Sequence, residues 1–145
     1  MATVNVYLNF NGNCEEAFNF YKSVFGGEFP YIGRFGEIPP SENYSVSESE
    51  ANKIMHVSLP ISKETVLMGS DTVGPMAAGF IAGNNFSISI NAESKEEAEK
   101  LFNCLSAGGQ VTMPLSKTFW SECFGMFTDK FGIAWMVSFD GNMQK

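Results

Sequence analysis

The sequence contains a single histidine, three cysteines and few basic residues. Its 145 residues include 9 lysines and arginines against 16 aspartates and glutamates, and the formal net charge is −7. A chain of this charge repels the phosphates of nucleic acids and the anionic head groups of lipids, and no local basic cluster offsets the balance. We therefore expect no nucleic-acid partner and no membrane partner.

The cysteines Cys14, Cys104 and Cys123 are odd in number and lie far apart in the sequence. This spacing matches neither a disulfide framework nor a metal-binding motif, and it is typical of reduced thiols in a reducing compartment. The chain also lacks an apolar run long enough to span a bilayer, and its start lacks the features of a signal peptide. We therefore expect a cytoplasmic location.

One pattern occurs twice in the sequence, at residues 13–27 and again 81 positions later. Each copy begins with an Asn or Ser that can cap a helix, and each ends at a pair of glycines that can terminate one. Between them lie apolar residues at positions i, i+3, i+4 and i+7, the stripe of a helix that covers a sheet. These residues are Ala17, Phe20, Tyr21 and Val24 in the first copy, and Ala98, Leu101, Phe102 and Leu105 in the second. One structural unit is therefore expected twice.

Alternating segments that are typical of strands surround each predicted helix. Residues 4–10 and 85–91 alternate with period two, and each predicted helix is followed by a short strand and a hairpin. The hairpins at 54–71 and 123–140 have the same length and align without a gap, which places Leu67 on Met136. The polar, acidic segment 39–52 is expected to form a surface excursion or lid.

We predict an α+β fold in one domain that spans residues 1–145. It consists of two tandem βαβββ modules, at 1–72 and 84–140, which a linker at 73–83 joins. One helix packs on each module, and the two modules pair to form a cup-shaped mixed sheet.

The strand faces that the helices leave uncovered would line this cup. Alternation assigns Leu67 and Met136 to these faces together with several polar residues. Trp120, in the loop after the sixth strand, could form an aromatic lid over the cup or a contact between subunits. The predicted ligand-binding residues are Tyr7, Asn9, His56, Ser58, Asn85, Ser87, Trp120 and Met136.

His56 is the only histidine, so it would have to serve any mechanism that needs an imidazole base or ligand near neutral pH. The alternative is a hydrogen-bonded residue of the cup wall without a chemical role. Tyr7 and Asn9 could likewise orient a small polar ligand or form a cross-strand polar pair. Cys14 lies at the start of the first predicted helix, where the helix dipole can lower the pKa of its thiol.

The duplicated βαβββ pattern, with its specific motifs, resembles the vicinal oxygen chelate superfamily, which includes glyoxalase I, extradiol dioxygenases and bleomycin-resistance proteins. The similarity is greatest to the PhnB-like branch, whose members are often labelled 3-demethylubiquinone methyltransferase-like. The motifs are Leu8-Asn9-Phe10-Asn11-Gly12-Asn13, Val24-Phe25-Gly26-Gly27-Glu28, Ile54-Met55-His56, Thr118-Phe119-Trp120 and Asp129-Lys130-Phe131-Gly132-Ile133-Ala134-Trp135. The resemblance implies a homodimer with a ligand site in the cup.

Metal-dependent members of the superfamily hold a divalent ion with side chains of the first and last strands of each module. Carried onto this chain, these places fall near Asn5, Leu67, Asn85 and Met136, none of which is a strong ligand for such an ion. The glycine pairs end helices instead of opening them, so no loop is expected to cradle the cosubstrate of a methyltransferase.

We therefore expect a protein that binds a small, partly apolar ligand in the cup, without the usual metal site and without a cofactor. The alternative is an enzyme of lyase, isomerase or dioxygenase type that acts on a small oxygenated substrate. In that case His56 would be its base, or a ligand of a divalent metal. A purely structural or interaction module would leave the polar strand faces unexplained.

Overall fold

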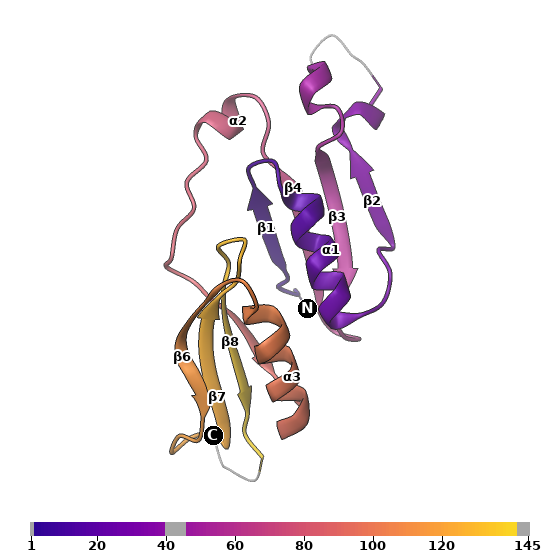
Figure 1. The fold of residues 1–145 in the computed structure, drawn as a ribbon. Helices are drawn as coiled ribbons and strands as arrows, with labels where there is room; N and C mark the ends of the chain where they lie inside the picture. The colour runs from indigo at the N-terminus through magenta and orange to yellow at the C-terminus, as the bar shows by residue number, and fades with distance from the viewer. Residues whose placement is uncertain (1, 40–45, 142–145) are drawn as a thin grey trace. The chain divides into compact units, whose positions relative to one another are not determined.

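The computed structural model describes residues 2–39 and 46–141, and these form two compact units that divide between Ile81 and Ala82. Each unit contains a four-stranded mixed sheet with one long helix (Figure 1). Within the described residues, none of the helices combines the length and apolarity needed to cross a bilayer.

The first unit has the predicted order of strand, helix and three strands. These are β1 (Val6–Phe10), α1 (Cys14–Phe25), β2 (Tyr31–Arg34), β3 (Ile54–Pro60) and β4 (Val66–Asp71). The strand order in the sheet is β1-β4-β3-β2, with β1 parallel to β4 and the other pairs antiparallel. Two short 3-10 turns, Phe35–Glu37 and Glu48–Glu50, and the four-residue helix α2 (Pro75–Ala78) lie outside this repeat.

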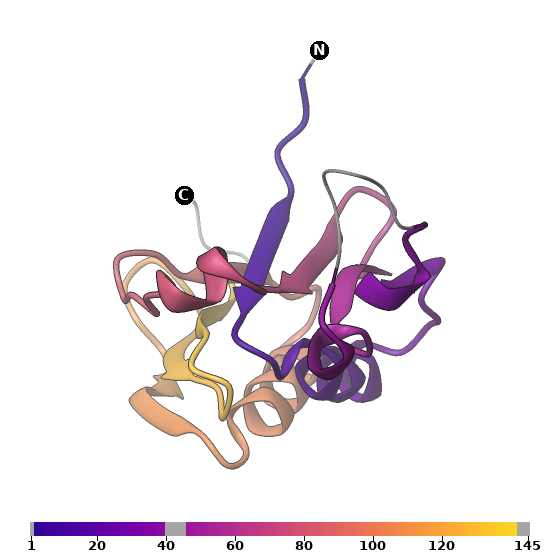
Figure 2. The same cartoon turned by 90° about the horizontal axis from the view of Figure 1, so that it is seen from above.

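The second unit repeats the order and the pairing. Its elements are β5 (Ile88–Asn91), α3 (Lys95–Ser106), β6 (Gln110–Ser116), β7 (Cys123–Thr128) and β8 (Ala134–Phe139), with the strand order β5-β8-β7-β6. Seen from above, α1 and α3 each lie on one side of the strands of their own unit (Figure 2). The prediction of two βαβββ modules in an α+β fold is therefore confirmed, and the pairing of the modules into a cup stays a prediction.

The apolar stripe of α3 is the predicted one, whereas that of α1 is rotated. Ala98, Leu101, Phe102 and Leu105 are buried as expected, but the buried residues of α1 are Cys14, Ala17, Phe18 and Tyr21. The ring of Phe18 packs on Gly69 of β4, where a side chain would have its Cβ only 2.6 Å from the ring. Since Gly69 leaves space for this ring, Phe18 becomes a core residue and Phe20 is partly exposed.

Asp71, at the end of β4, connects three parts of the first unit. One carboxylate oxygen accepts hydrogen bonds from the backbone N–H groups of Gly12 and Cys14, and the other accepts one from Ile54, all at 2.9 Å. The side chain of Asn13 makes no capping bond, so the expected cap at this helix is wrong. Asp71 satisfies the N–H group of Cys14 at the helix N-terminus instead. In α3 the expected cap is present, because Ser94 accepts a hydrogen bond from the N–H of Glu97.

The gapless alignment of the two hairpins is wrong by one residue. Leu67 pairs with Val6 and Leu59 and is 1% exposed, whereas Met68 pairs with Tyr7 and Ser58 and lies on the opposite face. In the second unit Trp135 and Val137 of β8 are fully buried, and Met136 between them lies on the opposite face. Met136 therefore corresponds to Met68. A shift of one residue moves every side chain of a strand to the other face, so Leu67 belongs to the core.

Candidate functional site

The face of the first sheet opposite α1 carries most of the residues that the sequence predicts for a ligand site in this unit. We call it the open face. Its members come from all four strands. Tyr7, Met68, Ser58 and Tyr31 form one row across the sheet, in which each residue pairs with the next. On the same face Asn9 pairs with Ser70, and His56 pairs with Gly33.

His56 stands between two tyrosines on this face. The hydroxyl of Tyr7 lies 3.1 Å from Nδ1 of His56, within hydrogen-bonding distance. The ring centroid of His56 is 5.5 Å from that of Tyr7 and 5.8 Å from that of Tyr31. Tyr7 and Tyr31 are 42% and 48% exposed, so a ligand can reach both rings. The sequence singled out Tyr7 and His56 by alternation but missed Tyr31.

Gly33 explains how Tyr31 comes to lie beside the histidine. Gly33 pairs with His56 across β2 and β3, and a Cβ atom at this position would collide with the hydroxyl end of Tyr31. The absence of a side chain lets the Tyr31 ring lie over the strand, toward His56. A glycine next to a tyrosine and an isoleucine in a predicted strand was the signal that could have identified this close approach.

A bulge in β3 determines on which face of the sheet the residues before His56 lie. Gly33 pairs with His56 but Arg34 pairs with Ile54, so Met55 is the extra residue of β3. Simple alternation would place Met55 on the same buried face as Val57. Because of the bulge, Ile54 is fully buried instead and Met55 is partly exposed. The assignment of His56 and Ser58 to the face opposite Val57 and Leu59 holds.

Asn9 completes the polar part of the open face. The hydroxyl of Ser70 donates a long hydrogen bond of 3.5 Å to Oδ1 of Asn9, and Asn9 itself is exposed. Ser58 is half-buried between Tyr31 and Met68 in its row. The open face therefore combines aromatic rings with uncharged hydrogen-bonding groups.

The predicted residues of the second unit have different surroundings. Asn85 and Ser87 precede β5 in irregular, exposed chain, so they do not lie on the predicted strand. Met136 lies in a row with Met126 and Met113 across β8, β7 and β6. Trp120 is 41% exposed and contacts the rings of Phe119 and Phe124.

The places at which the resemblance would put a metal ion carry poor ligands in this structure. Leu67 is buried on the helix side of its sheet, and Asn85 lies outside the strand. The amide of Asn5 already accepts a hydrogen bond from the N–H of Val66. The described residues contain no group of three or more His, Cys, Asp or Glu side chains that could hold a metal ion. The donors at these places do not fit a hard or borderline divalent ion.

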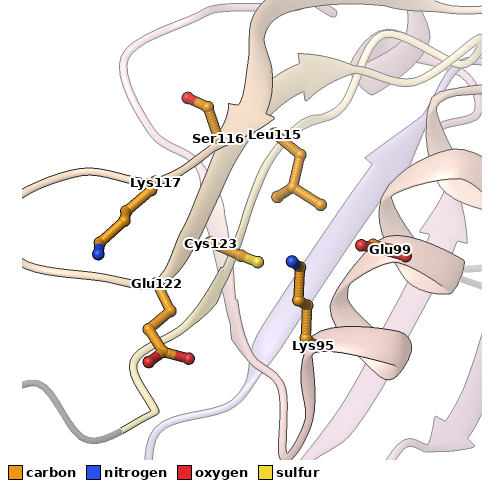
Figure 3. A pocket seen from close by; sticks show the side chains of 7 residues that line it. All are labelled: Lys95, Glu99, Leu115, Ser116, Lys117, Glu122 and Cys123. Carbon is orange, nitrogen blue, oxygen red and sulfur yellow. The ribbon is translucent and has the colours of Figure 1, made fainter.

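A pocket of about 500 Å³ lies in the second unit, between α3 and the strands β6 and β7 (Figure 3). In Figure 3 the side chains of Lys95 and Cys123 point toward one another across it. Both charge signs are present in its lining, which consists of Lys95, Glu99, Leu115, Ser116, Lys117, Glu122 and Cys123. This pocket could not be predicted from the sequence, because its charged residues resemble the solvated face of an ordinary helix and loop.

Burial keeps two of the cysteines in the thiol form. It is the main cause that raises the pKa of Cys14, and the nearby carboxylates of Asp71 and Glu15 raise it further. Burial also raises the pKa of Cys123, although Lys95 opposes the effect. The helix dipole does not activate Cys14, which is fully buried. Neither residue has the properties of a nucleophilic thiolate.

Comparison with known proteins gives matches over nearly the whole chain. The family described as 3-demethylubiquinone-9 3-methyltransferase matches residues 2–138. Protein YjdN of Escherichia coli (strain K12) is 33% identical over 91% of both chains. The crystal structure of protein PA1353 from Pseudomonas aeruginosa is 42% identical, with a TM-score of 0.82 over 97% of this chain and 98% of that one.

Two further solved structures have a fold similar to that of this chain. A putative 3-demethylubiquinone-9 3-methyltransferase, PhnB protein, from Bacillus cereus is 27% identical, with a TM-score of 0.73 over 95% of this chain and 99% of that one. A glyoxalase-related enzyme from Fulvimarina pelagi is 16% identical, with a TM-score of 0.58 over 100% of this chain and 99% of that one. The second likeness concerns the fold alone.

Proposed function

The chain belongs to the family described as 3-demethylubiquinone-9 3-methyltransferase, within the glyoxalase and bleomycin-resistance superfamily, and we propose that it binds a small, partly apolar molecule on the open face. The observation that carries this proposal is the cluster of Tyr7, His56 and Tyr31, in which two half-exposed rings flank a histidine. Small-molecule sites combine apolar and aromatic surface with a few placed polar groups, and this face has that composition.

The family description names a methyltransferase, but the glycines do not support methyl transfer from a nucleotide-like cosubstrate. Gly26 and Gly27 follow α1 with φ angles of 81° and 82°, and the N–H of Gly26 bonds to the carbonyl of Lys22. Gly108, with φ of 79°, follows α3 in the same way. These residues end helices, whereas loops that cradle phosphates open them.

Thermal unfolding in the presence of small compounds tests the proposal. We expect at least one member of a panel of aromatic acids, alcohols and quinones to raise the melting temperature by about 3–5 °C at roughly ten times its Kd. The increase should be lost in His56→Ala and persist in Ser89→Ala, a control on the strand of the second unit. A panel without effect, or stabilisation that survives His56→Ala, would contradict the proposal.

The alternative, an enzyme that uses His56 as a base or as a ligand of a divalent metal, makes a different prediction. Protein purified without chelators would then contain close to one divalent ion per chain, and His56→Ala would remove it. Binding of an organic ligand that is unchanged by a chelator favours the metal-free binding protein.

A further inference from the structure

The hydrogen bond between Tyr7 and His56 bears on what the histidine can offer a ligand. It involves Nδ1, and among the residues that the structure describes, Nε2 of His56 has no hydrogen-bond partner. Neutral imidazole has one nitrogen that donates and one that accepts, so the role of Nδ1 fixes the role of Nε2. The partner of Nδ1 therefore decides what Nε2 can do.

The chemistry of the pair favours one arrangement of the proton. A phenol hydroxyl is a stronger proton donor than the N–H of neutral imidazole, and an imidazole nitrogen is a stronger acceptor than a phenol oxygen. The Tyr7 hydroxyl then donates to Nδ1, which leaves the ring proton of His56 on Nε2. In this form Nε2–H can donate a hydrogen bond and cannot accept a proton.

The surroundings of Nε2 restrict the ligand further. The residues named on the open face carry hydroxyl, amide and thioether groups, and none of them carries a carboxylate. The half-exposed ring of Tyr31 stands beside the imidazole and offers a surface on which a flat apolar group can stack. A ligand oxygen that accepts from Nε2–H would complete the hydrogen bonding of the histidine.

We propose that Tyr7 is the positioning residue that holds the proton of neutral His56 on Nε2, so that His56 binds an acceptor oxygen, carboxylate or carbonyl, of an aromatic ligand. This inference rests on the proposed function and names its ligand class. It also assigns His56 the role of a hydrogen-bond donor in place of a general base, because a base would need an unprotonated Nε2.

The single histidine makes the proton position directly measurable. Long-range 1H–15N correlation of the ring at about pH 8.5, above the ordinary titration range of histidine, should show Nδ1 unprotonated and Nε2 protonated. Tyr7→Phe keeps the ring and removes the hydroxyl. The 15N chemical shifts of both ring nitrogens of His56 should therefore move toward the values averaged over the two tautomers. Tyr31→Phe is the matched control, and it should leave both chemical shifts unchanged. A proton on Nδ1 in the wild type, or no change in Tyr7→Phe, would overturn the inference without affecting the binding proposal.

Titration with benzoate and, separately, with benzylamine tests the ligand class. Benzoate at up to about 10 mM should shift the Nε2–H resonance, and Tyr7→Phe should weaken its binding at least about fivefold. Benzylamine has the same ring but a cationic donor group, and it should leave the Nε2–H signal unchanged. A response to benzylamine alone, or none to benzoate, overturns the ligand class, while the compound panel still decides the proposed function independently.

Discussion

At the scale of single residues, the side chain of Asp71 connects three parts of the first unit. Its buried carboxylate accepts three backbone hydrogen bonds, from the loop before α1, from the first residue of α1 and from the start of β3. Hydrogen bonds to charged groups contribute more than neutral ones, and a buried group that loses its partner costs the full desolvation free energy.

We expect Asp71→Asn to lower the free energy of unfolding by about 2–4 kcal/mol, because an amide has only one acceptor oxygen for these three N–H groups. Urea denaturation followed by circular dichroism measures this change. Glu64→Gln, in the exposed turn between β3 and β4, is the control and should change stability by less than about 0.5 kcal/mol. Equal stability of the two variants would show that the Asp71 contacts contribute little.

The three cysteines should differ in reactivity according to their burial. Cys104 is exposed, whereas Cys14 and Cys123 are buried and have raised thiol pKa values. At about pH 8, iodoacetamide should modify Cys104 at least about tenfold faster than the other two, which react only after local or global unfolding. Mass spectrometry of peptides at successive times measures the order. Rapid modification of Cys14 in folded protein would restore the hypothesis of an activated thiol.

At the scale of elements, an ion pair joins α1 to β2. The guanidinium of Arg34 bonds both carboxylate oxygens of Glu15, at 3.0 and 2.6 Å, and also donates to the carbonyl of Asn52 at 2.8 Å. The hydrogen bonds of Arg34 hold the pKa of Glu15 below its usual range. Both side chains remain partly exposed, so the pair contributes modestly despite its bidentate geometry.

Glu15→Gln should lower stability at pH 7 by about 0.5–1 kcal/mol. A carboxyl whose pKa is lowered by folding stabilises the protein above its unfolded pKa, and this contribution is lost as the pH falls through the folded value. The difference between wild type and variant should therefore shrink as the pH falls below 4.5, the ordinary value of a glutamate. Urea denaturation of both proteins at several pH values measures this difference in stability. The exposed substitution Glu16→Gln is the control. A difference that is independent of pH would contradict the ionic origin.

At the scale of the whole molecule, two exposed aromatic residues lie next to one another in a loop. Phe119 is 91% exposed and packs on Trp120 in the loop between β6 and β7. Aromatic residues are enriched in the buried cores of protein interfaces. We propose that this loop contributes to contacts between two copies of the chain.

Sedimentation of the wild type at about 10 µM should then give a dimer. Phe119→Ser should raise the dissociation constant of this dimer at least about tenfold. Val4→Ser, which changes another exposed apolar residue in the first unit, is the control. A wild-type monomer, or a dimer that Phe119→Ser leaves unchanged, would remove this loop from the interface.

The sequence by itself determined the class of fold and its duplication, because helix and strand periodicities are local properties of the chain. Two βαβββ modules, the stripe of α3 and the positions of Tyr7 and His56 on the open face all follow from such patterns. The resemblance to a family has the same origin.

Tertiary structure alone decided which of several apolar residues enter the core. In α1 the apolar residues Phe18, Phe20, Tyr21, Val24 and Phe25 allow more than one apolar stripe, and the space over Gly69 selects Phe18. The register that buries Leu67 and exposes Met68 arises from pairing between strands distant in the sequence, and so does the bulge at Met55. Tyr31 approaches His56 because Gly33 has no side chain. Periodicity assigns faces, but contacts between distant segments determine which side chains meet, and the candidate site depends on those contacts.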